Sequence, residues 1–201
     1  MNSTVASHAK ARTPDPTSST ATVVADMSMS LDGFVADPDD RVDRVFAWYG
    51  KPQPPRQSAG EAERDASDLG VIVYGRRTFE VAKGWGGNHP MGVPVIVVTH
   101  TIPDGWPRPD STVSFATDGI ESAIEQARAI AQGKVVALGS PSITQQCLDL
   151  GLLDRIQVSL VPLLLGEGIR FFENLASAPI ELQGPTVSEG NGVTHLCYRV
   201  A

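Results

Sequence analysis

The sequence is poor in cysteine, in aromatic residues and in long apolar runs. Only two of its 201 residues are cysteines, Cys147 and Cys197, and neither has a second cysteine nearby in the chain. This excludes a disulfide scaffold or a zinc ribbon and fits a reducing, cytoplasmic compartment. The longest apolar runs, 93–98 and 161–165, are far shorter than the ~20 residues that a membrane-spanning helix needs. We therefore expect no membrane contact.

Basic residues are in deficit as well. The chain carries 16 Lys and Arg against 23 Asp and Glu, which gives a formal net charge of −7. A general affinity for nucleic acid or for anionic lipid is therefore not expected. No group of His, Cys and carboxylate side chains has the spacing of metal ligands, so we expect no metal site. Hydrophobic residues make up 41% of the chain, which is a globular composition.

The first 21 residues are nearly free of large apolar side chains and are rich in Ser, Thr, Pro and Ala. Such a stretch buries too little surface to offset the entropy of ordering it, and it has no apolar core of a secretory signal. We expect a flexible tail over 1–21, with wrapping of a partner subunit as the alternative. One folded domain is expected over 22–201.

Strand and helix patterns alternate through this domain, which predicts an α/β fold with a mainly parallel sheet. The last two strands follow each other without a helix, so an antiparallel edge is expected. The apolar spacing of 118–132 predicts the clearest helix, with Asp118 and Glu121 as its cap. The expected strands are 23–29, 71–74, 95–99, 112–117, 134–138, 156–160, 180–187 and 193–200. The other expected helices are 43–49, 60–69, 76–83 and one that Ser140 caps ahead of Pro141.

Two strand-to-helix turns could hold phosphate groups. In the first, Gly75 permits a tight turn, and Arg76 or Arg77 can bind a phosphate with two hydrogen bonds. In the second, Gly139 permits close backbone approach and Ser140 can bond an oxygen. Amides at the start of a helix favour an anion. The alternatives are a solvated arginine pair and an ordinary capped helix. Two such turns together suit the two ends of a dinucleotide.

The turns belong to an ordered set of segments that resembles a known family. The segments are 30–36 (SLDGFVA), 75–80 (GRRTFE), 139–140 (GS) with 151–154 (GLLD), and 162–172 (PLLLGEGIRFF). From residue 23 to residue 200 the chain resembles the dihydrofolate-reductase-like superfamily, and within it the stand-alone relatives of the reductase domain of bifunctional riboflavin biosynthesis enzymes. The resemblance implies a central, mostly parallel sheet of about eight strands with an antiparallel edge and flanking helices.

The resemblance also implies an NADPH-dependent reductase that transfers hydride to a small heterocycle, similar to 5-amino-6-(5-phosphoribosylamino)uracil reductase. Carried over by position, Arg76, Arg77 and Thr78, after Gly75, would hold the cofactor phosphates. Thr99 and His100 would lie near the adenosine ribose and its 2′-phosphate. The pyrophosphate and nicotinamide ribose would contact Gly139, Ser140, Ser142 and Ile143. The nicotinamide ring would lie beside Ala25 and Met27, under a loop of residues 30–33 that ends at Gly33.

The substrate side of the site is less defined by the sequence. Asp32 could donate or relay a proton, or only form a turn with Gly33. Trp85 could stack on a flat ring, or pack within its glycine-rich loop. Arg170 could hold an anion, and His89 is a candidate titrating group or a surface histidine.

One segment departs from the family. Where the riboflavin enzymes often carry Asp-Asp-Pro, this chain has residues 81–85 (VAKGW). This leaves the substrate open and motivates a second hypothesis, a non-catalytic protein that binds NADPH or a heterocycle on the same scaffold. A homodimer is expected from the family alone.

Overall fold

An eight-stranded sheet forms the centre of the computed structural model, which describes residues 21–49 and 68–201. The strands are ordered β5-β4-β3-β6-β1-β7-β10-β9. Their bounds are β1 (Val23–Ser30), β3 (Leu69–Gly75), β4 (Val95–Val98), β5 (Val113–Ala116), β6 (Val135–Leu138), β7 (Arg155–Val161), β9 (Leu182–Gly190) and β10 (Val193–Val200). From β5 to β7 all neighbours are parallel, whereas β10 and β9 are antiparallel. The predicted fold class is confirmed.

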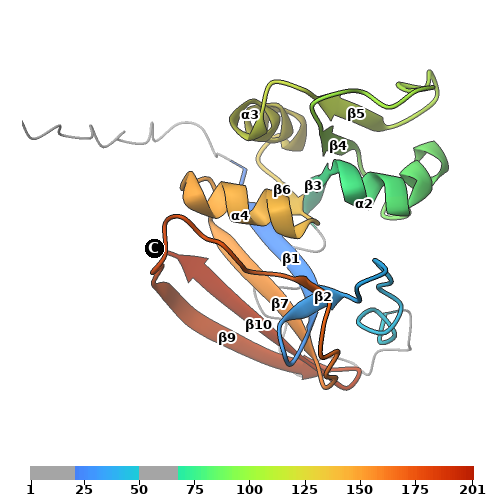
Figure 1. The fold of residues 1–201 in the computed structure, drawn as a ribbon. Coiled ribbons are helices and arrows are strands. Elements are labelled where there is room, and N and C mark those ends of the chain that lie inside the picture. The colour runs from blue at the N-terminus through green and yellow to red at the C-terminus, as the bar shows by residue number, and fades with distance from the viewer. Residues whose placement is uncertain (1–20, 50–67) are drawn as a thin grey trace, which may run out of the picture.

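The two faces of the sheet are covered differently. Helices α3 (Ile120–Ala131) and α4 (Pro141–Asp149) pack with Val71, Val73 and Ala25 in the larger core cluster. Side chains alternate between faces along a strand, so Tyr74 and Asp26 lie on the opposite face. There α2 (Arg76–Val81) and the 3₁₀ turn η1 (Lys83–Gly87) pack on β4 and β5 in a smaller, aromatic cluster. Figure 1 shows β4 and β5 at one end of the sheet and the β9–β10 hairpin at the other.

The expected elements are largely present, with several corrections. Residues 43–49 form hydrogen-bonded turns and not a helix. The start of α3 lies at Ile120 with Gly119 at the cap position and no side-chain cap, so the predicted Asp118 cap is wrong. The backbone of Gly119 has a φ of 93°, a conformation that glycine adopts without strain. The expected helix over 60–69 lies outside the described residues except at its end, where Leu69 already begins β3.

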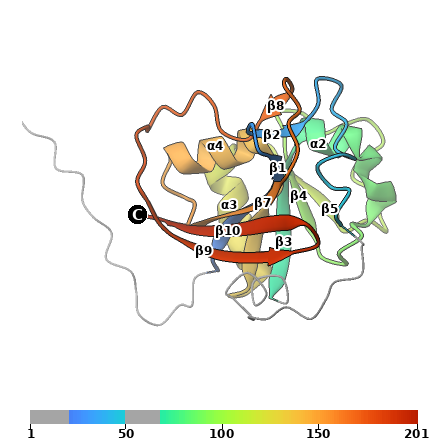
Figure 2. The same ribbon diagram turned by 90° about the horizontal axis from the view of Figure 1, so that it is seen from below.

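A small second sheet was not anticipated from the sequence. It pairs β2 (Phe34–Ala36) with β8 (Ile169–Arg170), which lie side by side in Figure 2. Neither segment is among the strands expected from the sequence. Strands of two or three residues that pair with a remote segment leave no local periodicity to read.

The first described residue is already buried, and the strand at the outer edge of the sheet is exposed. The expected tail lies outside the described residues, apart from Ala21, which is already buried. The edge strand β9 is exposed along most of its length and contains Gly184 and Pro185, where its register with β10 shifts. Within the described ranges, no helix is long and apolar enough to cross a membrane.

Candidate functional site

The two predicted turns lie next to each other. Because β3 and β6 are parallel neighbours, with Val73 opposite Leu138, both strands end at the same edge of the sheet. The Gly75 amide donates a hydrogen bond of 3.0 Å to Ser140 Oγ. The same oxygen lies 2.7 Å from Thr78 Oγ1. Ser140 therefore joins the start of α2 to the start of α4.

This link corrects the predicted use of both turns. Ser140 holds the cap position of α4, with Pro141 next, but its side chain makes no cap hydrogen bond to that helix. The Gly75 amide, expected to face a ligand, is used by Ser140 instead. The start of α4 consequently has no side-chain cap, and the amides of its first turn, including Ser142 and Ile143, remain suited to an anion.

Gly139 is required by a neighbouring ring. A Cβ built on Gly139 would lie 2.1 Å from Cε1 of Tyr74, so the Tyr74 ring occupies the space that any side chain would need. At Gly75 the corresponding Cβ would lie 3.4 Å from Ser142 Oγ and 3.5 Å from Ile143, which is ordinary contact. The sequence predicts that a ligand approaches the backbone closely at Gly139, but the group that does so is the Tyr74 ring of the neighbouring strand.

The predicted phosphate-binding arginines are both engaged in ion pairs. Arg76 contacts Glu80, with Nε 2.6 Å from Oε1, and donates a second hydrogen bond to the carbonyl of Thr101. Arg77 binds Asp40, which raises the pKa of this guanidinium. These pairs are solvent-exposed, and exposed pairs are weak. A phosphate group at this position would compete with carboxylates already in place.

Thr99 and His100 follow β4 beside these arginines. Thr99 is buried, and its hydroxyl donates a 2.9 Å hydrogen bond to the carbonyl of Thr101. The same carbonyl accepts from Arg76. His100 is exposed. The structure therefore brings Thr99, one of the two predicted 2′-phosphate residues, next to Arg76.

The predicted contacts of the nicotinamide ring on β1 are core residues. Ala25 is 0% exposed and Met27 is 6% exposed, and both side chains belong to the larger core cluster. The exposed residue between them is Asp26, on the other face of the sheet. Any ring beside this strand would therefore meet Asp26 and not the side chains of its neighbours.

Asp32 fixes the loop that follows β1. Its carboxylate accepts hydrogen bonds from Ser30 Oγ at 2.6 Å and from the amides of Leu165 and Gly166 at 3.1 and 2.7 Å. These bonds, the one from Ser30 foremost, lower the pKa of Asp32 to about 2. An acid of this strength is ionised near neutral pH and does not donate a proton there. The geometry favours the turn interpretation of Asp32.

Arg170 and Gly33 lie beside that loop. The Arg170 guanidinium lies over the Phe34 ring, 4.5 Å from its centroid, and a Cβ on Gly33 would be 3.8 Å from it. Gly33 has a φ of 91°. These residues form a group with Asp32 at the β2–β8 pair.

Trp85 packs within an aromatic group that the sequence analysis did not anticipate. Its ring centroid is 4.7 Å from that of Tyr74 and 5.0 Å from that of His89. Tyr74 was not singled out from the sequence. The available signal was its place directly before Gly75, alternating with the buried Val71 and Val73.

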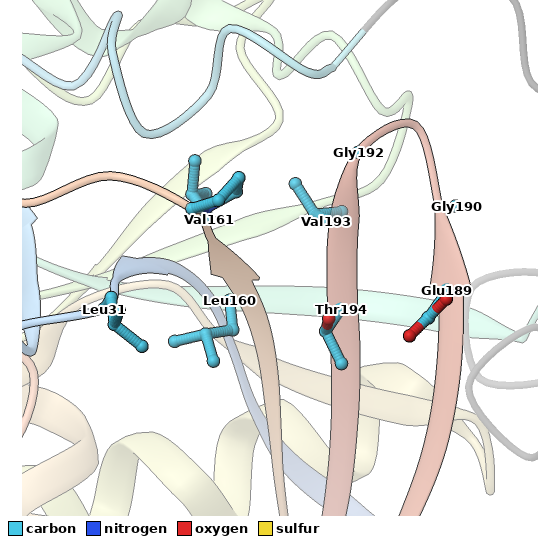
Figure 3. Close-up of a pocket in the computed structure, with 9 residues that line it drawn as sticks. Leu31, Leu160, Val161, Glu189, Gly190, Gly192, Val193 and Thr194 are labelled. Carbon is cyan, nitrogen blue, oxygen red and sulfur yellow. The ribbon is translucent and has the colours of Figure 1, made fainter.

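An open depression of about 590 Å³ lies at the ends of β1 and β7, beside the β9–β10 turn (Figure 3). Leu31, Leu160, Val161 and Val193 contribute apolar side chains to it, and Glu189 a charged one. Leu31 belongs to the predicted 30–33 loop, but none of the predicted phosphate-binding residues lines this depression. No cationic side chain is found among the described residues that line it, so the two joined turns are the stronger candidate for a dinucleotide.

Comparisons with solved structures support the fold. A protein assigned to riboflavin biosynthesis from Shewanella sp. PV-4 is 21% identical, with a TM-score of 0.66, over 90% of this chain and 99% of that one. The Thermotoga maritima diaminohydroxyphosphoribosylaminopyrimidine deaminase/5-amino-6-(5-phosphoribosylamino)uracil reductase is 13% identical, with a TM-score of 0.59. It matches over 90% of this chain and 57% of its own.

A third similar structure is the dihydrofolate reductase from Enterococcus faecalis, complexed with NADP(H) and RAB-propyl. It is 14% identical, with a TM-score of 0.54, over 89% of this chain and 96% of that one. A search of curated proteins found no match. The family model described as the RibD C-terminal domain matches residues 21–187. With a match over most of its length, this chain belongs to the RibD C-terminal domain family, a reductase-type family with a dihydrofolate-reductase-like fold.

Proposed function

We propose that the protein is an NADPH-dependent reductase that transfers hydride to a small heterocycle, of the type of 5-amino-6-(5-phosphoribosylamino)uracil. The observation that carries the proposal is the hydrogen bond between the Gly75 amide and Ser140, which joins the two turns at one edge of the sheet. Ligands of open α/β sheets bind at this edge, beyond the carboxyl ends of the strands. The family match supports the reductase class.

The residues at this edge fit a dinucleotide phosphate. The first turn of α4 has no side-chain cap, so its amides suit the pyrophosphate, with Gly139, Ser140, Ser142 and Ile143 around it. Arg76, Arg77 and Thr78 would bind further phosphate oxygens by exchanging their present partners. Thr99 and His100 would contact the 2′-phosphate, which favours NADPH over NADH. When bound, the reduced nicotinamide supplies the hydride.

The substrate side is assigned to the face of the sheet that carries Trp85, and to the β2–β8 pair. Trp85 would present part of its ring as a wall for a flat heterocycle. Arg170 would hold an anionic group of the substrate. Asp32 would keep the 30–33 loop attached to residues 165–166 and so hold the cover of the site in place, a role that needs its ionised form.

A second candidate is a protein that binds NADPH or a heterocycle without turnover. The ionised state of Asp32 favours it, because the acid predicted from the sequence cannot supply a proton. The two candidates differ in one measurable property. Both bind NADPH, but only a reductase oxidises it when a substrate is present.

The experiment is a titration of NADPH and NADH against the intrinsic tryptophan fluorescence, followed by an absorbance assay of NADPH oxidation with 5-amino-6-(5-phosphoribosylamino)uracil, pterins and pyrimidinediones. Tighter binding of NADPH than of NADH, with oxidation, supports the proposal. No binding of either nucleotide below millimolar concentration overturns it. We also propose that the protein is cytoplasmic and forms a homodimer. Light scattering of the purified protein tests the dimer.

A further inference from the structure

We propose that the Tyr74 hydroxyl, held by His89, supplies the proton that the substrate takes up in this reduction. The inference rests on the proposed reductase function and deepens it, because the function needs a proton donor and Asp32 does not serve as one. The proton donor would then lie on the face of the sheet opposite α3 and α4. His89 acts as the positioning residue.

The location of Tyr74 is set by the register of three strands. Ala25 and Val73 are both opposite Leu138, so one position further along Tyr74, Gly139 and Asp26 form a row across β3, β6 and β1. Tyr74 directly precedes Gly75, and Gly139 directly precedes Ser140. The hydroxyl-bearing ring therefore lies at the two joined turns, beside the exposed Asp26.

The Tyr74 ring is held from several sides. Gly139 leaves the space that the ring occupies, as the 2.1 Å distance to a Cβ built there shows. The Trp85 ring packs against it, with centroids 4.7 Å apart. The hydroxyl oxygen lies 3.1 Å from Nε2 of His89. Tyr74 is nevertheless partly exposed, so the ring that carries the oriented hydroxyl is not sealed within the core.

The hydrogen bonds of His89 fix the direction of this contact. The Met91 amide donates a 3.2 Å hydrogen bond to Nδ1, so Nδ1 carries a lone pair. A neutral imidazole then bears its proton on Nε2 and donates it to the Tyr74 oxygen. Burial lowers the pKa of His89, which keeps the ring neutral. The Tyr74 O–H is left to donate to another acceptor.

Burial and the neighbouring groups keep Tyr74 protonated in the resting protein. Burial raises the pKa of Tyr74, and the nearby Asp26 and Tyr49 raise it further. A free tyrosinate is thus disfavoured at rest. Asp26 also raises the pKa of Tyr49, after burial. Asp26, Tyr49 and His89 are accordingly the groups whose titration would alter that of Tyr74.

In the proposed step, Tyr74 would protonate the heteroatom of the group that is reduced. Hydride transfer would break a C–H bond of the bound dihydronicotinamide, which leaves the oxidised cofactor, and form a C–H bond at the carbon of a C=N or C=O group of the substrate, whose π electrons would move to the heteroatom. The Tyr74 O–H bond breaks as the heteroatom–H bond forms. The resulting tyrosinate oxygen accepts the hydrogen bond from His89 Nε2, and a proton from water restores the hydroxyl.

Three variants test the inference by single-turnover NADPH oxidation with 5-amino-6-(5-phosphoribosylamino)uracil. Tyr74→Phe keeps the ring over Gly139 but removes the hydroxyl, and we expect a rate lower by roughly 10²–10⁴-fold, the range of a general acid. His89→Ala should lower the rate about tenfold, the scale of one hydrogen bond. His89→Gln keeps an N–H donor and should restore most of the loss.

Four further readouts separate a proton donor from a structural residue. The Kd for NADPH should be unchanged in Tyr74→Phe. We expect a solvent deuterium isotope effect on the wild-type rate, and it should be smaller in Tyr74→Phe. Tyr198→Phe, the same chemical change at a tyrosine of β10 that packs against the larger core cluster, should keep the wild-type rate. In the unliganded protein, ¹⁵N spectra should show the His89 proton on Nε2.

Each outcome decides a separate point. A wild-type rate in Tyr74→Phe, or a proton on Nδ1 of His89, overturns this inference and leaves the proposed reductase function intact. NADPH that binds to the wild type but is not oxidised with any acceptor tested overturns the reductase function, and this inference with it.

Discussion

The hydroxyl of Ser140 makes the sharpest prediction, because a single oxygen joins the two halves of the candidate site. Ser140 is 2% exposed, and its hydroxyl oxygen accepts a hydrogen bond from the Gly75 amide and contacts Thr78 Oγ1. In Ser140→Ala, a buried amide loses its acceptor, which typically costs about 1–3 kcal/mol, and the hydroxyl contact adds about 1 kcal/mol at most. We expect a loss of about 2–3 kcal/mol in the free energy of unfolding.

Urea unfolding followed by circular dichroism measures this loss. In a chain of this size, 1 kcal/mol corresponds to about 2–4 °C in Tm, so we also expect a Tm lower by about 4–12 °C. Ser142→Ala is the matched control in the same helix, because Ser142 is exposed. It should change the free energy by no more than about 0.5 kcal/mol.

The same variant tests the site. If the Ser140 link holds the two turns in register, Ser140→Ala should weaken NADPH binding as well as stability, at a temperature where the variant remains folded. A stability loss equal to that of Ser142→Ala would refute the reasoning, because the buried amide would then have another acceptor. Unchanged NADPH affinity would show that the link is structural only.

Three other perturbations have expected outcomes. Gly139→Ala should destabilise the fold by about 1–3 kcal/mol, because its Cβ meets a tyrosine ring, whereas Gly75→Ala should be tolerated; urea unfolding of both variants compares them. Asp32→Asn should cost stability above about pH 4 and lose that effect as the pH falls toward 2, since the folded pKa of about 2 lies below the ordinary value of 3.8 for an aspartate; a pH series of unfolding midpoints checks this, and a difference that persists at pH 2 would contradict it. Asp40→Asn removes the carboxylate that occupies Arg77, so calorimetry at low salt should show tighter NADPH binding, and weaker binding would exclude Arg77 as a phosphate ligand.

The sequence predicted those parts of the fold that have a local pattern. The alternation of apolar strands with helices such as 120–131 identified the parallel sheet, and the glycines before Arg76 and Ser140 identified the two turns. That these turns lie next to each other comes from the strand order, which places β3 beside β6. The family resemblance, which the family match confirms, supplied the reductase class.

The parts that could not be predicted depend on contacts between remote residues. Nothing near Ser140 in the sequence indicates that its hydroxyl faces Gly75 instead of its own helix. Nothing near Tyr74 indicates that its ring lies on Gly139, or that His89 meets its hydroxyl. Asp32 illustrates the same limit, because its acidity is set partly by amides more than a hundred positions away in the chain. Such effects follow from the assembled fold.

The outer strand β9 has a consequence for how copies of the protein can associate. An exposed strand of nine residues offers backbone groups with which another sheet could pair, and this would favour open-ended polymers. Pro185 has no amide to donate, and the register shift with β10 at this point interrupts the regular spacing of the strand. Continuous pairing along the whole strand is therefore blocked, and a closed dimer would have to use another surface or only one half of β9.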